Sequence, residues 1–397
     1  MDEIDLKNTL KSVKFGEVVK QIKDRIKDIE NSNLTEYTRG EHFESSNLNL
    51  IGRSKIGDGQ HGSAFHMRFR NRDVLYISRN PQLRKVAVAD YDGICANTTY
   101  VYRADNKILS HELLPFIMQT DHFVEFTIQH KRGSTNFYLN PSDIDPYEFY
   151  IPSLNEQQKI AKLFLAIENT LNNYKNTLKK LLVLKKSYLN STITQGISEG
   201  WPLVLFDSIL IDTQYGISKK SEFQSEGRVP ILGIPNIVAG DTDFSKIAWV
   251  KITNSEFEKY KIHKNDILIV RTNGNPNYVG RCVTLKIFPE NSVYASYLIK
   301  LKVHENIAIP SYIEAIINSD FLRANLQHEI RSSAGNYNLN TQGIRKQLIP
   351  LPPIETQKGI LNILETINTS QKSFELQINN TLLLKKSFMN KYLMNLK

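Results

Sequence analysis

The chain has 397 residues, of which 41% are hydrophobic, so it has room for two globular domains and is not a largely disordered protein. Lysine and arginine outnumber aspartate and glutamate by 50 to 41, and the net charge of +9 suits a polyanionic partner without requiring one. No apolar run reaches the roughly 18 residues of a membrane span, and the N-terminus has no apolar signal core, so we expect a soluble, cytoplasmic protein.

Residues 1–150 are predicted to form a first domain of mixed α and β structure. Short runs at 74–78 and 86–89 are rich in strand-forming residues and are separated by turn residues, and a helix is expected at 111–120. The polar loops concentrate side chains that hydrogen-bond base edges or phosphates. An ordinary solvated turn is the simpler interpretation of any one loop. The candidate DNA-binding residues of this domain are Arg39, His42, Arg79, Arg84, Lys85, Lys131, Arg132 and Thr135.

Residues 151–200 are predicted to form a long helix that begins after Pro152. No glycine or proline occurs between 154 and 191, and apolar residues recur at heptad spacing. The opposite face is expected to be polar, with Glu168, Asn172, Lys175, Lys179 and Lys180. The apolar positions are Ile160, Phe164, Ile167, Leu171, Tyr174, Leu178, Leu181 and Tyr188.

Residues 201–350 are predicted to form a second mixed domain. Strands are expected at 267–270, 283–287 and 297–303, and a helix at 311–326. Its loops again combine basic, amide and aromatic side chains. The candidate DNA-binding residues are Tyr215, Ser218, Lys219, Lys220, Asn236, Arg271, Asn273, Arg331, Asn336 and Asn338.

Residues 351–397 are predicted to form a second long helix, in which 351–390 repeat 151–190 at a constant offset of 200. Identities include Pro152 and Pro352, Gln157 and Gln357, and the Lys-Lys-Ser segments that begin at 185 and 385. The apolar positions are Ile360, Leu364, Ile367, Phe374, Ile378 and Phe388. In the globular domains the offset drifts from 191 to 200, with Asn80 matching Asn273. The chain is therefore a tandem duplication whose domains differ in loop length.

Two matching apolar stripes in one chain favour an antiparallel coiled coil, although two helices packed separately on their own domains remain the alternative. A helix of about 36 residues at 1.5 Å per residue is roughly 54 Å long. This length is enough to separate two domains by a turn of B-DNA, roughly 34–36 Å.

Catalytic motifs are weak. The glycines at 57, 59 and 62 fit a dinucleotide-binding pattern, but a strand is predicted after them where that site needs a helix. Asn275-Pro276-Asn277-Tyr278 resembles an aminomethyltransferase motif but lacks its second proline. His130 and His328 recur between the copies and are interpreted as helix-end capping or packing residues. Cys95 and Cys282 have no metal-site spacing. Because each of these motifs is weak or incomplete, we expect no catalytic residue, metal or cofactor in this chain.

Two variable domains, each followed by a Pro-x-x-x-x-Gln helix with Lys-Lys-Ser-aromatic near its end, resemble the specificity subunits of Type I restriction-modification enzymes. The resemblance rests on 151–157 and 351–357, where Thr356 replaces the usual glutamate, and on 229–237 and 265–271. It implies an α+β fold in which two target-recognition domains form a pseudo-two-fold repeat, separated by two long helices in an antiparallel coiled coil.

The resemblance also implies a function. Each domain would read half of a bipartite asymmetric site in double-stranded DNA, and the helices would set the spacer and dock two modification (methyltransferase) subunits. Restriction subunits would complete the complex, and S-adenosylmethionine, ATP and magnesium would bind to those partners. Two alternatives are a stand-alone methyltransferase, for which the chain has no room, and a coiled-coil scaffold without DNA specificity.

Overall fold

The computed structural model describes residues 10–29, 31–237, 242–333 and 335–394. It divides into two compact units whose boundaries fall inside the two long helices. The first unit joins the chain up to Asn176 to the chain from Phe374 onward, and the second comprises Thr177–Ser373. Each unit therefore contains one globular domain and one end of each long helix.

The first unit contains two four-stranded sheets and a two-stranded ribbon. The ribbon pairs β1 with β10, and the sheets have the orders β2-β9-β6-β7 and β4-β3-β8-β5. The strands are β1 (Lys11–Lys14), β2 (Val19–Ile22), β3 (Glu36–Thr38), β4 (Ser54–Lys55), β5 (Phe65–Phe69), β6 (Val74–Ile77), β7 (Val86–Val88), β8 (Gly93–Ala96), β9 (Thr99–Ala104) and β10 (Glu148–Ile151). The short helices are α1 (Phe15–Val18), α2 (Leu114–Ile117), α3 (Asp121–Gln129) and α4 (Pro141–Ile144), with 3-10 turns η1 (Gly40–His42) and η2 (Pro81–Leu83).

The second unit repeats the ribbon as β11-β22 and the first sheet as β12-β19-β15-β17. Two three-stranded sheets, β14-β13-β18 and β16-β21-β20, complete it. The strands are β11 (Leu203–Leu205), β12 (Leu210–Tyr215), β13 (Val229–Leu232), β14 (Ala248–Val250), β15 (Ile267–Val270), β16 (Thr272–Asn273), β17 (Cys282–Thr284), β18 (Val293–Tyr294), β19 (Leu298–Val303), β20 (Arg331–Ser333), β21 (Asn336–Asn338) and β22 (Leu348–Pro350). The helices are α6 (Asn254–Tyr260), α7 (Pro310–Asn318), α8 (Asp320–Glu329) and α9 (Thr341–Arg345), with 3-10 turns η3 (Phe206–Ile209) and η4 (Ile234–Asn236).

Strand register confirms the duplication residue by residue. Ile77 lies opposite Thr99 in the β6-β9 pair, and Val270 lies opposite Leu298 in the β15-β19 pair. The residues that follow β6 and β15, and those that precede β9 and β19, are therefore structurally equivalent. Asn80 and Asn273 occupy the same place in the two copies, as predicted.

The predicted closing helices are wrong in their bounds. Instead of a helix at 111–120, the structure has the single turn α2 and then α3, because the Thr120 hydroxyl accepts the Phe123 N–H at 3.2 Å and starts a new helix. The predicted helix at 311–326 is likewise divided into α7 and α8 by Ser319, which accepts the Leu322 N–H. The strand predicted at 283–287 ends at Thr284, and Ile287 is exposed.

The two long helices are α5 (Leu154–Ser198) and α10 (Ile354–Met389), and a π-helical turn, η5 (Asn390–Met394), ends the second. The first helix continues as far as Ser198, where Ile193 is buried and Gly196 lets the Trp201 ring pack directly on the helix.

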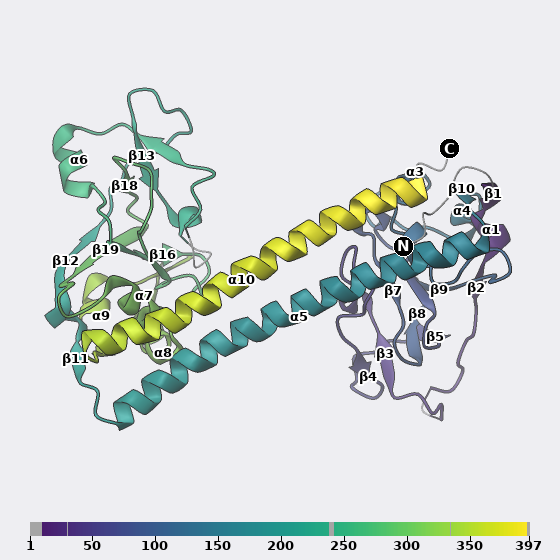
Figure 1. Cartoon of the computed structure of the whole chain (residues 1–397), viewed down its shortest axis with the longest axis horizontal. Coiled ribbons are helices and arrows are strands. Elements are labelled where there is room, and N and C mark those ends of the chain that lie inside the picture. Colours follow the sequence, from purple (N-terminus) through teal and green to yellow (C-terminus); the bar gives the residue numbers. More distant parts are fainter. Residues whose placement is uncertain (1–9, 30, 238–241, 334, 395–397) are drawn as a thin grey trace. The chain divides into compact units, whose positions relative to one another are not determined.

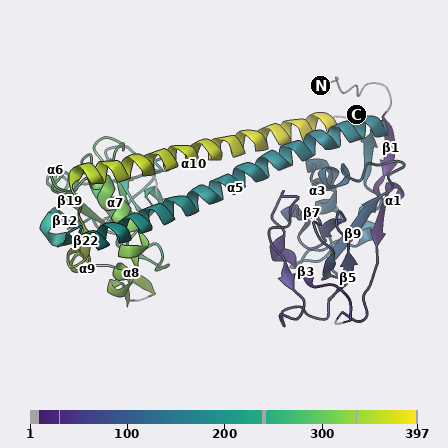
Figure 2. The same ribbon diagram turned by 60° about the horizontal axis from the view of Figure 1, so that its bottom comes forward.

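Within each unit, one end of α5 packs against the opposite end of α10 (Figures 1 and 2). In the first unit, Ile160 and Phe164 share a core with Phe388 and Met389, and the rings of Tyr174 and Phe374 lie 5.8 Å apart. In the second, the later part of α5 shares a core with Ile360 and Leu364. The antiparallel pairing is therefore confirmed, and each helix also packs on a domain. Leu178 and Leu181, toward the middle of α5, are only half-buried.

Glu168, which we predicted to lie on the polar outer face of its helix, is instead buried. Its carboxylate pairs with the ammonium of Lys385, and these two side chains are only 9% and 7% exposed. Lys385 also donates to the Gln119 side chain at 3.0 Å. The prediction considered one helix alone, whereas α10 and the domain both cover this position.

The repeated glutamines join each long helix to its domain. The Gln157 amide accepts the Ser110 N–H at 2.8 Å and donates to the carbonyls of Ile108 and Pro152. Gln357 accepts the Ile309 N–H at 2.9 Å and makes the two equivalent donations. Both amides are buried, so each satisfies backbone groups that would otherwise lack partners.

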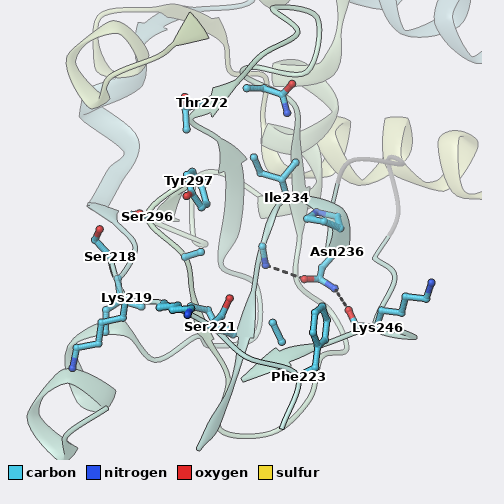
Figure 3. Close-up of a pocket in the computed structure, with 18 of the residues that line it drawn as sticks. Ser218, Lys219, Ser221, Phe223, Ile234, Asn236, Lys246, Thr272, Ser296 and Tyr297 are labelled. Carbon is cyan, nitrogen blue, oxygen red and sulfur yellow. Dashed lines mark hydrogen bonds between the residues drawn. The ribbon is translucent and has the colours of Figure 1, made fainter. Parts of the chain in front are cut away.

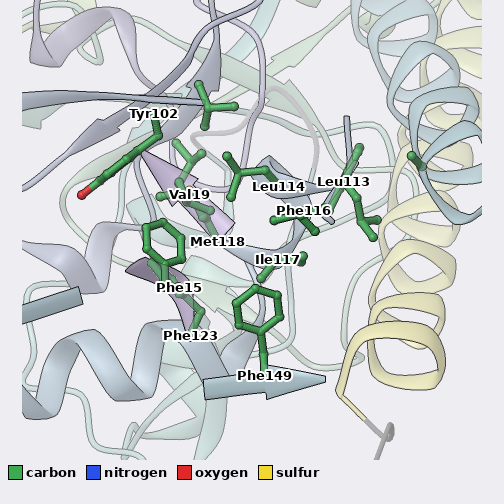
Figure 4. Packing of buried hydrophobic residues seen from close by; sticks show 14 of the residues in the cluster. Phe15, Val19, Tyr102, Leu113, Leu114, Phe116, Ile117, Met118, Phe123 and Phe149 are labelled. Atoms are coloured by element: carbon green, nitrogen blue, oxygen red, sulfur yellow. The ribbon is translucent and has the colours of Figure 1, made fainter. Parts of the chain in front are cut away.

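Aromatic side chains connect the sheet of the first unit to the long helix. Phe15 packs edge-on against Tyr102 (Figure 4). Phe116 of α2 stacks on Phe164 of α5, with 5.0 Å between the ring centres. The loops at the ends of the strands are thus held on a rigid support. In the described part of the chain, no helix is both long and apolar enough to cross a membrane.

Candidate nucleic-acid interface

In the first domain, two of the predicted loops meet. Arg79 and Arg132 both form antiparallel bridges with Tyr138, and the Asn80 N–H donates to the Phe137 carbonyl at 3.0 Å. We call segments 78–85 and 130–139 the first loop junction. It contains six of the eight residues predicted to bind DNA in this domain, namely Arg79, Arg84, Lys85, Lys131, Arg132 and Thr135.

In the second domain, the corresponding loops also meet, as the sheet β16-β21-β20. Asn273 lies opposite Tyr337, and Arg331 lies opposite Asn338. We call segments 271–274, 331–333 and 335–339 the second loop junction. It contains Arg271, Asn273, Arg331, Asn336 and Asn338 of the predicted residues.

The two junctions are equivalent at the level of single hydrogen bonds. The Ser78 N–H donates to the Thr98 carbonyl at 2.9 Å, and the Arg271 N–H donates to the Tyr297 carbonyl at 2.8 Å. The Leu139 N–H then donates to the Ser78 carbonyl, as the Leu339 N–H does to that of Arg271. One scaffold therefore presents two different sets of side chains.

Cations in the first junction are oriented by aromatic rings and carboxylates. The Arg79 guanidinium lies 5.8 Å from the centre of the Tyr138 ring, and the Lys131 ammonium lies 3.7 Å from that of Phe137. Arg132 forms a bidentate pair with Asp143, and this hydrogen bonding keeps the pKa of Asp143 below its ordinary value. Thr135 is exposed in the same hairpin.

The remaining cations of this junction face the rest of the domain. Arg84 pairs with Asp121 at 2.5 Å, and the Lys85 ammonium donates to the Gly40 carbonyl at 2.6 Å. The second contact places the loop that holds Arg39 and His42 beside the junction. Arg39 pairs with Glu41 and donates to Gln60 at 2.9 Å.

Two of the residues predicted to bind DNA are buried within their own loops. His42 is 8% exposed, burial lowers the pKa of its imidazole, and its Nδ1 lies 3.3 Å from the Arg39 N–H. Asn236 is also buried, where it accepts the Gly233 N–H and donates to the carbonyls of Asp243 and Lys246. Both side chains have little surface left with which to contact a ligand, and they organise their loops.

In the second domain, Arg271 lies over an aromatic ring. Its guanidinium is 4.4 Å from the centre of the Tyr215 ring and donates to the Ser296 carbonyl at 3.2 Å. The Tyr215 hydroxyl accepts the Thr341 N–H at 3.2 Å. These contacts hold Arg271 and Tyr215, which were both predicted to bind DNA, at the second loop junction.

A cavity of about 860 Å³ adjoins the second junction (Figure 3). Six predicted residues line it, namely Ser218, Lys219, Lys220, Asn236, Asn273 and Asn336. Lys219 is held at the wall by Glu256, at 2.7 Å. The second domain thus offers a hollow surface with amide, hydroxyl and ammonium groups.

Sequence reasoning missed Tyr297 and Phe223, which also line this cavity. Their side chains are 57% and 83% exposed. Tyr297 was assigned to a strand, although β19 begins one residue later. Its equivalent in the first copy is Thr98, so the aromatic ring belongs to the part of the duplication that has diverged.

The long helices carry a further repeated feature, an exposed apolar triplet in each unit. Residues 182–184 and 382–384 are exposed despite being leucine or valine. Each triplet directly precedes the Lys-Lys-Ser segment. Apolar side chains that remain exposed at matching places suit a protein contact in each unit.

The weak catalytic motifs have ordinary structures. The glycine pattern at 57–62 precedes strand β5, as expected. The Tyr278 N–H donates to the Asn275 carbonyl at 3.1 Å in a turn. His130 stacks on Phe126 and its Nδ1 lies 2.8 Å from that residue's carbonyl, which confirms its packing role at the helix end.

Comparison with known proteins identifies the same repeat. Residues 8–182 and 208–384 each match the model of the Type I restriction modification DNA specificity domain. The EcoKI specificity subunit of Escherichia coli (strain K12) is 26% identical over 296 residues, which cover 69% of this chain and 63% of that protein. The StySPI specificity subunit of Salmonella potsdam is 22% identical over 257 residues, which cover 62% and 55%. The chain thus spans less than two thirds of the length of these relatives.

Solved structures share the fold over nearly the whole chain. The Type I S subunit from M. genitalium has a TM-score of 0.63 at 14% identity, covering 99% of this chain and 98% of that one. A chain from a study of assembly and conformational transition of the type I R-M system has a TM-score of 0.56 at 16% identity, covering 96% and 97%. Since the two family matches together cover most of the chain, and each includes a domain and much of the helix after it, the protein belongs to the family of Type I restriction-modification specificity subunits.

Proposed function

We propose that each domain reads one half of a bipartite, asymmetric site in double-stranded DNA. The single observation that carries this proposal is the pair of equivalent loop junctions with different side chains. Arginine and asparagine form bidentate hydrogen bonds with guanine and adenine edges, and lysine and threonine contact phosphates. One scaffold with two side-chain sets suits the reading of two unlike half-sites.

We further propose that α5 and α10 set the spacer and dock two methyltransferase subunits. The constant offset of 200 between the helices supports a role in which helix length matters, unlike the loops, whose lengths have drifted. The apolar triplets at 182–184 and 382–384 supply one docking surface in each unit. Restriction subunits complete the assembly in the cytoplasm, where the DNA lies.

In this proposal the chain itself is not catalytic. S-adenosylmethionine, ATP and magnesium bind to the methyltransferase and restriction partners, and this subunit decides where they act. The glycine motif at 57–62 leads into strand β5, and the methyltransferase-like motif at 275–278 forms a turn. A coiled-coil scaffold without DNA specificity is the rival function.

The test uses the chain in complex with its methyltransferase subunits and a library of random duplexes at near-physiological salt. We expect retention of one bipartite motif, with an affinity that falls steeply as salt rises because phosphate contacts release counterions. Exchange of residues 201–350 for the same domain of a relative should alter one half of the motif and leave the other unchanged. A scaffold would retain no motif, and a change in both halves would contradict the division between domains.

A further inference from the structure

The cavity beside the second loop junction has a composition unlike that of a surface that only follows a DNA groove. Amide and hydroxyl side chains, including Asn273, Asn336 and Ser218, share its lining with the rings of Tyr297 and Phe223. Ser218 and the two rings are labelled in Figure 3. Groups that read base edges within a duplex form hydrogen bonds or, at the thymine methyl group, apolar contacts, and neither contact needs two rings beside one cavity. Exposed rings beside hydrogen-bonding groups are typical of sites that hold an unstacked base.

The rings are placed for this use. Tyr297 directly precedes β19, and its backbone carbonyl is held by the Arg271 N–H of the junction at 2.8 Å. Phe223 enters the cavity from the other side of the lining, on the segment that follows Lys219 and Lys220 (Figure 3). The exposure of Tyr297 therefore occurs on a fixed backbone at the proposed DNA interface.

The first copy differs at the position of Tyr297. Thr98 stands at the position of Tyr297, although both carbonyls accept the equivalent N–H. The hollow described in the first domain lies elsewhere, and its lining has no aromatic residue: it consists of Ile29, Leu34, Thr35, Glu36, Lys55, Ile56 and Gly57. The difference makes the first domain an internal control for any function of the cavity.

We propose that the cavity receives one nucleobase rotated out of the duplex in the half-site read by the second domain. The base stacks on Tyr297, and Phe223 closes the site from the opposite wall. Asn273 and Asn336 face the hydrogen-bonding edge of the base, and the exposed Lys220 and Lys246 balance the charge of the displaced phosphates. This inference rests on the proposed function and adds the mode of recognition in the second domain.

The test measures binding by the full complex after its motif is known. An abasic residue is placed opposite each base of both half-sites in turn, which leaves the base itself intact and removes its pairing partner. Where a base is extruded, binding should tighten by roughly tenfold or more because the cost of unpairing is removed in advance. In the second half-site, we expect this tightening at one position besides the adenine that the methyltransferase itself extrudes. In the first half-site, we expect it at no position besides such an adenine.

Tyr297→Thr, which installs the residue of the first copy, should abolish the tightening, and Phe223→Ala should reduce it. Both side chains are exposed, so the fold should persist, which circular dichroism checks. Tyr150→Thr, at an exposed tyrosine on β10 of the first domain, is the matched control and should retain the tightening. If selective binding is intact but no position shows a Tyr297-dependent gain, the inference is overturned and the proposed function stands. If no selective binding is found, the proposed function fails, and the inference fails with it.

Discussion

Single cations in the loop junctions differ in how much of their charge is available to DNA. Arg132 is engaged by both oxygens of Asp143, and Arg84 is paired with Asp121, whereas Arg79 is exposed and lies beside the Tyr138 ring. An aromatic neighbour orients a guanidinium without neutralising it. Arg79 is therefore the cation of the first domain that we expect to contribute most to recognition.

Arg79→Ala should weaken binding of the complex by about 1–3 kcal/mol and relax the motif at one position of the first half-site if Arg79 contacts a base. If it contacts a phosphate instead, the motif is unchanged and the salt slope falls by about one. Affinities over a series of salt concentrations separate these results. Arg72→Ala removes an exposed arginine paired with Glu112 outside the junction and should change neither. Relaxation in the second half-site would contradict the assignment of Arg79 to the first.

Residue types alone could identify the candidate cations, but they could not rank them. His42 and Asn236 are good DNA-binding residues by type, yet each is buried and hydrogen-bonded within its own loop. Tyr297 had no signal, because a tyrosine before a predicted strand is usually part of the sheet. Burial depends on what packs over a residue, and a single sequence does not contain that information.

At the level of elements, the long helices combine a predicted apolar stripe with an unpredicted buried ion pair. In the first unit Lys385 of α10 meets Glu168 of α5, whereas in the second unit the equivalent Lys185 approaches Glu314 of α7. Burial raises the pKa of Glu314 above its ordinary value, and the Lys185 ammonium opposes part of that rise. The repeated lysine thus interacts with a carboxylate of α5 in the first unit and with a carboxylate of α7 in the second.

Lys385→Met should destabilise the first unit by about 3–5 kcal/mol, because it leaves the Glu168 carboxylate buried without its partner. Lys385→Met combined with Glu168→Met should recover most of that loss. Hydrogen exchange of the amides in α3, measured over a urea series, reports on the unit concerned. Lys386→Met, at the exposed neighbouring lysine, is the control. The interpretation fails if Lys385→Met costs no more than the control.

The apolar triplets allow a second test at this scale. Val183→Asp and Leu383→Asp should each remove one methyltransferase subunit from the assembly, since a charge in an apolar contact loses its hydration. The double variant should remove both, as measured by mass photometry of the reconstituted complex. Leu376→Asp is matched to them, because Leu376 is equally exposed on α10 but faces no apolar counterpart in the repeat, where the residue is Asn176. Retention of both partners by the double variant would place the docking surface elsewhere.

For the whole molecule, the proposed role of the paired helices in setting the spacer can be tested at the boundary between the two units. Seven residues inserted after Asn176 in α5 and seven after Ser373 in α10 lengthen both helices at the boundary between the units. At 1.5 Å per residue the insertion adds about 10 Å, or about three base pairs. The spacer should therefore lengthen while both half-sites stay the same, as read from methylated-adenine motifs in a host genome. Altered half-sites with an unchanged spacer would reverse the proposed roles of helix and domain.

The amino-acid sequence by itself determined the duplication, the heptad stripes, most central strands and the resemblance to the specificity-subunit family. These properties are periodic or repeated along the chain, so they can be recognised without knowing any long-range contact. The helix starts after Thr120 and Ser319 could also have been predicted, since threonine and serine both cap helices. The apolar residues on either side made each pair of helices resemble one continuous helix.

Only the tertiary structure decided which loops meet, which polar groups are buried and where the surface is hollow. Lys385 and Gln119 are 266 residues apart in sequence and 3.0 Å apart in space. The two junctions, the burial of Glu168 and the exposure of Tyr297 all arise from such contacts. They depend on the packing of segments whose loop lengths have drifted, and no local pattern specifies how those segments fit together.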